Sequence, residues 1–149
     1  EPDPKIDLSG VDVARKILIL IRESGYEMEM ESIENNCFLP QECMETKNNE
    51  DFFRSLTKHS SHFENLLAEA KAKDCRIKFV ASFDNGKASV GLQFIPKESP
   101  FYNLEGKDNI VEFYTDRYID QPLIIKGAGA GAAVTASGIF ADVIRIGNV

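Results

Sequence analysis

The sequence predicts an α+β fold in which a mixed, largely antiparallel sheet carries helices on one face. Residues 77–83 and 88–94 each alternate apolar and polar side chains, and Asn85-Gly86 separates them, which is a strong β-hairpin signal. Helical apolar spacing precedes the hairpin, and two further strand-like segments follow it. Amphipathic helices on one face of a sheet are the simplest way to bury these patterns together.

The first long helix is expected to begin after Ser9 and to end near Gly25. Ser9 would cap the helix with its hydroxyl, Asp12 would place an acid in the first turn, and the glycine is a common helix stop. Residues 17–21 are all apolar, which predicts a largely buried helix. Asp12 and Lys16 then lie one turn apart on the same face.

The middle of the chain is expected to alternate short strands and helices. Residues 30–39 predict a strand that Pro40 ends, and residues 50–56 predict a short helix. Ser61 with Glu64 three residues later has the pattern of a capping box at the start of another helix. The apolar residues that follow recur at helical spacing and are interpreted as core: Phe63, Leu66, Leu67 and Ala70.

After the hairpin, residues 110–115 and 122–126 predict two more strands, and residues 132–146 predict a C-terminal helix. This helix contains three poor helix formers, so packing against another surface is expected to hold it: Val134, Thr135 and Gly138. With 43% hydrophobic side chains and no internal linker, residues 1–149 are expected to form one globular domain.

Composition excludes several classes of function. The net charge of −7 argues against nucleic-acid binding, which needs a basic face. The longest apolar run, residues 17–21, is far shorter than the roughly 20 residues of a membrane span, so no membrane partner is expected. The three cysteines lack metal-ligand spacing and are interpreted as mostly packed, reduced thiols of a cytoplasmic protein. His59 and His62 are interpreted as solvated helix-end histidines, and no metal site is expected.

Acids cluster around a lysine at the start of the chain: Glu1, Asp7 and Asp12 precede Lys16. An exposed ion pair one turn apart would stabilise the helix by only about 0.2–0.5 kcal/mol. A functional cluster is favoured here, because the helix is largely apolar and two further acids precede the pair. The chemistry leaves two roles open. The ammonium group could donate a proton to a developing alkoxide, or the carboxylates could hold the amino group of an amino acid.

At these residues a family resemblance appears. Residues 1–16 closely resemble the substrate-site signature of homoserine dehydrogenase, and residues 127–142 look like that family's C-terminal loop and helix. The resemblance implies the catalytic-domain fold of that family. It also implies reversible, NADP- or NAD-dependent interconversion of aspartate 4-semialdehyde and homoserine, on the route to threonine, methionine and isoleucine.

The resemblance also implies roles for individual residues. Lys16 aligns with the catalytic lysine that protonates the carbonyl oxygen, and Asp7 aligns with another acid important for activity. Glu1 and Asp12 align with acids that bind the substrate's amino group. Gly131 aligns with a backbone contact to the cofactor. The sequence departs from the usual family pattern at two positions without an assigned catalytic role, Lys5 and Ile6, where arginine and aspartate are more common.

The glycine-rich loop of residues 127–132 is a weak signal when taken alone. It satisfies the loose form of a dinucleotide fingerprint, but too little chain follows Ala132 to supply the second strand and its acid about 20 residues further on. The glycines therefore permit close backbone approach, either to a neighbouring helix or to a cofactor held by another domain. The resemblance favours the cofactor.

The family pattern places a nucleotide-binding domain before this segment, so the chain is expected to be a fragment that is close to inactive alone. The parent protein could also carry an aspartokinase. The C-terminal helix would return to the nucleotide-binding domain and expose an apolar face without it, and the sheet would form a homodimer or larger homo-oligomer. The alternative is a non-catalytic amino-acid-binding regulatory module, in which Lys16 only balances charge. A purely oligomeric interface domain is a weaker third interpretation.

Overall fold

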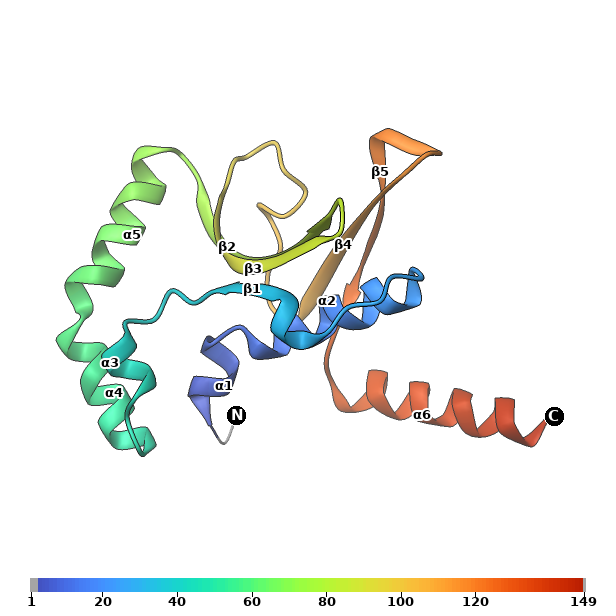
Figure 1. The fold of residues 1–149 in the computed structure, drawn as a ribbon, viewed down its shortest axis with the longest axis horizontal. Coiled ribbons are helices and arrows are strands. Elements are labelled where there is room, and N and C mark those ends of the chain that lie inside the picture. Colours follow the sequence, from blue (N-terminus) through green and yellow to red (C-terminus); the bar gives the residue numbers. More distant parts are fainter. Residues whose placement is uncertain (1–2, 149) are drawn as a thin grey trace. The chain divides into compact units, whose positions relative to one another are not determined.

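The structure is a computed structural model that describes residues 3–148. The chain divides into two compact units, Glu1–Ser99 and Pro100–Val149, and each is described by itself (Figure 1). Among the described residues, no helix combines the length and apolar character needed to cross a bilayer.

The first unit contains a three-stranded mixed sheet in the order β1-β3-β2. Its strands are β1 (Ile33–Asn36), β2 (Arg76–Asp84) and β3 (Lys87–Ile95). Strands β2 and β3 form the predicted antiparallel hairpin, whereas β1 pairs with β3 in parallel. Asn85 and Gly86 have φ values of 47° and 78°, and positive φ at both central residues is what a tight type I′ turn requires. The hairpin and the mixed character of the sheet are confirmed.

The described part of the first unit contains five α-helices: α1 (Pro4–Leu8), α2 (Val11–Glu23), α3 (Gln41–Met44), α4 (Asn49–Lys58) and α5 (Ser60–Ala72). Both predicted hydroxyl caps were wrong. Ser9 ends α1, and Gly10 precedes α2 without a side-chain cap. The helix α5 begins directly after His59, so Ser61 already lies within it. The predicted strand at residues 30–39 is also shorter, because a 3₁₀ turn, η1 (Met30–Ser32), replaces its first residues.

Helix α2 packs on one face of the sheet, and α5 ends beside the same face. Ala14 and Ile21 of α2 pack against Ile33, Ala88 and Val90. The ammonium group of Lys73, directly after α5, lies 4.8 Å from the ring centroid of Phe94. Phe94 and Val90 point to the same side of β3, because they are four residues apart on one strand. The expected arrangement of helices on one face is therefore confirmed.

The expectation that α2 is largely buried was wrong. Only Ala14 and Ile21 of this helix are buried, and Ile19 is 60% exposed. The physical reason is that a three-stranded sheet covers one side of a helix and leaves the opposite side to solvent. The apolar run at residues 17–21 therefore spans both the packed and the exposed side.

A second cluster of buried residues joins α3, α4 and the segment after β1. Leu39, Cys43 and Phe52 form its centre, and Leu8 of α1 packs against it. Cys43 is fully buried, Cys75 is partly buried and Cys37 is exposed, so the expectation of packed thiols fails for Cys37.

This difference in burial predicts selective thiol chemistry. A thiol reagent such as Ellman's reagent is expected to modify Cys37 in the native protein and to spare Cys43, because the reagent must reach the sulfur. Peptide mass spectrometry after timed labelling would measure both rates, and labelling in denaturant is the control in which both thiols react. Equal rates in the native protein would contradict the packing of α3 against α4.

The second unit consists of an antiparallel pair and a terminal helix: β4 (Asp108–Thr115), β5 (Tyr118–Ala128) and α6 (Ala132–Gly147). Both strands are longer than predicted, and they form a separate two-stranded sheet. Desolvation and then the Glu112 carboxylate raise the pKa of Tyr114 above its usual value. No residue of α6 is buried, and its apolar side chains are exposed: Val134, Ile139, Phe140, Val143, Ile144 and Ile146.

Candidate active site

The first helix is short and firmly attached. Asp3 caps α1 by accepting a hydrogen bond from the Lys5 backbone N–H at 3.0 Å, and Pro4 occupies the first helical position. The Lys5 ammonium group donates to the Thr46 carbonyl at 2.6 Å, which ties α1 to the segment between α3 and α4. Lys5 thus has a structural contact at a position where the sequence departs from the family pattern.

The corner between α1 and α2 is buried against the sheet. The Ser9 N–H donates to the Lys5 carbonyl at 2.8 Å, and the Asn35 amide donates to the Ser9 carbonyl at 2.9 Å. Gly10 is buried and has φ +80°, a conformation that side chains disfavour. A Cβ atom at Gly10 would lie only 2.8 Å from Cε1 of Phe79. Contacts with both β1 and β2 therefore fix the start of α2.

The predicted acid and lysine lie on α2, just after this corner. Asp12 is in the first turn and Lys16 follows one turn later, and both side chains are exposed. The nearest cation to Asp12 in an ion pair is Arg15, at 3.7 Å, with both side chains more than half exposed. Such a pair contributes at most about 1 kcal/mol. Both charges therefore remain in solvent, and the apolar character of the helix does not bury them.

The other predicted acids are on or before α1. Asp7 is exposed on α1, which contacts α2. Glu1 lies outside the described residues. The structure thus places Asp7 on one helix and Asp12 and Lys16 on the next, on either side of the fixed corner at Gly10. Their exposure leaves the carboxylates and the ammonium group accessible to a small molecule.

Gly131 belongs to the second unit, where it precedes α6 with φ 139° and ψ 150°. A Cβ atom at this position would meet no other atom within 4 Å. Gly129 differs, because a Cβ atom there would lie 2.5 Å from Cγ of Asn109. Packing within the unit therefore accounts for Gly129. Gly131 is instead accounted for by its φ of +139°, which side chains rarely adopt, and the space where its Cβ atom would lie is open.

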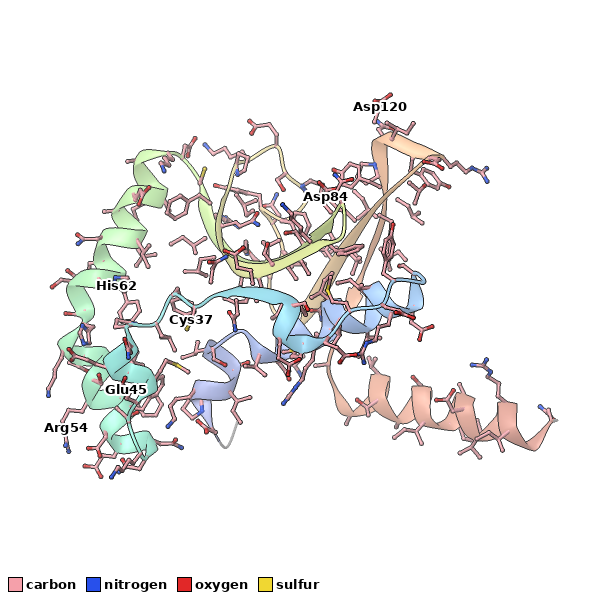
Figure 2. The ribbon with its side chains drawn as sticks, viewed as in Figure 1. Cys37, Glu45, Arg54, His62, Asp84 and Asp120 are labelled. Carbon is pink, nitrogen blue, oxygen red and sulfur yellow. The ribbon has the colours of Figure 1, made fainter. Side chains whose placement is uncertain are left out.

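An open, mostly apolar hollow lies elsewhere in the first unit. Its lining includes Cys37, His62 and Leu92, and none of the predicted site residues. Figure 2 shows His62 on α5 and Cys37 in the segment after β1. The imidazole Nε2 of His62 donates a hydrogen bond to the Phe38 carbonyl at 2.9 Å. The imidazole of His59 lies 3.1 Å from the Glu42 carboxylate. Within residues 3–148, no group of three His, Cys, Asp or Glu side chains is arranged to hold a metal ion.

Sequence reasoning missed the residues that anchor the site. Asn35 and Phe79 hold the corner from the sheet, and Thr46 receives Lys5. Phe79 was expected on the sheet through its alternation, but no local pattern shows that its ring meets Gly10. Asn35 lies in a polar run, residues 34–36, that carries no signal of a long-range hydrogen bond.

Comparison with known proteins decides the family. The family model for homoserine dehydrogenase matches residues 1–144. The chain belongs to the homoserine dehydrogenase family. The chain is 41% identical to the bifunctional aspartokinase/homoserine dehydrogenase of Haemophilus influenzae, and the match covers 97% of the chain and 18% of that protein. It is 42% identical to the homoserine dehydrogenase of Paracoccidioides brasiliensis, covering 98% of the chain and 40% of that protein.

Solved structures agree with this assignment. A crystal structure of a Candida auris protein described as of unknown function matches with a TM-score of 0.87 and 37% identity, covering 99% of this chain and 42% of that chain. A putative homoserine dehydrogenase from Archaeoglobus fulgidus matches with a TM-score of 0.67 and 25% identity, covering 98% of this chain and 38% of that chain. The chain therefore spans less than half the length of each of these four relatives.

Proposed function

We propose that this chain is the substrate-binding and catalytic part of an NAD(P)-dependent homoserine dehydrogenase, which interconverts L-aspartate 4-semialdehyde and L-homoserine. One observation carries the proposal. A segment with the family's sequence presents Lys16 and Asp12 on the exposed face of α2, directly after a corner that two strands hold. The exposure of Lys16 suits this role, because a proton donor must reach the substrate and must not be held in a buried ion pair.

In the proposed mechanism, Lys16 moves the proton. During reduction its ammonium group donates a proton to the aldehyde oxygen while the carbonyl carbon receives a hydride, which gives the alcohol. In the reverse direction the neutral amine accepts the hydroxyl proton. Asp12 and Glu1 hold the substrate's ammonium group by charge-assisted hydrogen bonds, and Asp7 orients Lys16 or the substrate.

A nicotinamide cofactor, NAD or NADP, would supply and accept the hydride when bound. Gly131 would contact it through the backbone, and the open space beside this glycine fits that role. We further propose that a nucleotide-binding domain elsewhere in the full-length protein provides most other cofactor contacts. By the same proposal, the enzyme is a cytoplasmic homodimer or larger homo-oligomer of threonine, methionine and isoleucine biosynthesis.

This division of labour predicts that residues 1–149 alone are close to inactive. Homoserine-dependent reduction of NAD⁺ and of NADP⁺, followed at 340 nm, would compare the isolated chain with the full-length protein. The full-length protein is expected to turn over with one or both cofactors, and the isolated chain to remain near background. Comparable turnover would contradict the proposed need for another domain. The same assay of the full-length protein measures which cofactor is preferred.

The alternative is an amino-acid-binding regulatory module. The ion pair between Asp12 and Arg15 favours this alternative, since a carboxylate that pairs with a cation other than Lys16 does not require a catalytic lysine. In such a module the carboxylates would bind an ammonium group without any reaction. Substitution of Lys16 separates the two functions.

A further inference from the structure

Asn35 makes one long-range contact with the corner that precedes α2. Its side-chain amide donates to the Ser9 carbonyl at 2.9 Å, across 26 positions of sequence. Ser9 is only 5% exposed, and its other polar groups are already used: the N–H donates to the Lys5 carbonyl at 2.8 Å and the hydroxyl to the Ile6 carbonyl at 2.9 Å. The amide of Asn35 thus satisfies the carbonyl that lies between the two helices.

The same side chain also limits how the corner can move. The Oδ1 atom of Asn35 lies 3.3 Å from the place where Gly10 would carry a Cβ atom, and the Phe79 ring lies beside it. The Gly10 carbonyl accepts the first helical hydrogen bond, from the Ala14 N–H at 2.9 Å. The amide from β1 and the ring from β2 therefore hold the residue from which α2 starts.

The direction of α2 controls where Lys16 lies. Lys16 is six residues after Gly10, about 9 Å along the helix axis at about 1.5 Å per residue, so a tilt of about 10° at the corner moves it by about 1.6 Å. Displacements of about 1 Å at a reacting group can lower a rate by about 100-fold.

We propose that Asn35 is a positioning residue for Lys16, acting through the Ser9 carbonyl. This inference rests on the proposed function of the site. Asn35 would set the angle at which α2 leaves the corner without touching the substrate. Its loss would therefore lower kcat through the lysine and leave the cofactor's KM unchanged.

The test uses two variants of the full-length protein. Asn35→Ala removes the amide, and Asn36→Ala removes the neighbouring amide, which alternates to the other side of β1, as a matched control. We expect Asn35→Ala to lower kcat about tenfold, as for a moderately misplaced reacting group, and Asn36→Ala to stay within about twofold. If Asn35→Ala fails to fold, Asn35→Asp, which preserves the shape but loses the donor, replaces it. Unchanged kcat in the folded Asn35 variant, or an equal loss in both variants, would overturn the proposal.

A double substitution with Lys16→Ala distinguishes positioning from a general structural role. If Asn35 acts through Lys16, Asn35→Ala has little further effect in the Lys16→Ala background. A further tenfold loss there would overturn the positioning role. A Lys16→Ala protein with unchanged turnover would instead refute the proposed function itself, so the two failures are distinguishable.

Discussion

Replacing Lys16 by alanine is expected to lower kcat of the full-length enzyme by about 100- to 10,000-fold, the range that a positioned proton donor contributes. Cofactor binding should change little, because the proposed role of Lys16 concerns the substrate's oxygen. Stability should also change little, since the side chain is exposed on α2. Steady-state kinetics with homoserine, cofactor titration and thermal unfolding measure these three quantities.

Arg15→Ala is the matched control for this prediction. Arg15 is the neighbouring cation and is exposed, and its substitution removes the same formal charge as Lys16→Ala. Its loss is expected to leave kcat within about threefold, because a surface pair contributes little. A regulatory module would give a different result, in which Lys16→Ala shifts amino-acid affinity and no dehydrogenase turnover is present to lose. Equal effects of the two substitutions would mean that only local charge matters.

Local patterns determined much of the fold. The Asn-Gly pair and the alternation on either side of it were enough to predict the β2–β3 hairpin, because both signals act between residues close in sequence. Other predictions from the sequence were wrong. Ser9 has the chemistry of a helix cap, but it ends α1, and its hydroxyl donates to the Ile6 carbonyl instead. Burial of α2 was overestimated because an apolar run cannot show how wide the covering sheet is.

The candidate site divides in the same way. The helical spacing of Asp12 and Lys16 follows from sequence, but the partner of Asp12 does not, since positions three and four residues away compete for the same carboxylate. The residues that hold the corner before α2 are still harder to predict from the sequence. The contact between Asn35 and Ser9 joins residues that are distant in sequence and depends on the position of β1 in the sheet, so it leaves no local pattern.

Gly10→Ala is expected to destabilise the corner by about 2–5 kcal/mol. Two costs combine. A left-handed conformation costs a residue with a Cβ atom about 1–2 kcal/mol, and overpacking against Phe79 adds about 1–3 kcal/mol. Gly10 has φ +80°, and the added Cβ would lie 2.8 Å from Cε1 of the ring. Hydrogen exchange of the α2 amides in the full-length protein would measure the local free energy of opening.

Gly25→Ala separates the conformational cost from the packing cost, because Gly25 has a similar left-handed backbone but no side chain beside it. Gly25 has φ +89° at the other end of α2, and a Cβ atom there would meet nothing within 4 Å. Its substitution should therefore lower stability by only the conformational part, about 1–2 kcal/mol. Phe79→Leu should in turn relieve part of the extra loss in Gly10→Ala. Equal losses at Gly10 and Gly25 would show that the ring does not limit the corner, and that backbone strain alone fixes the start of the helix that carries Lys16.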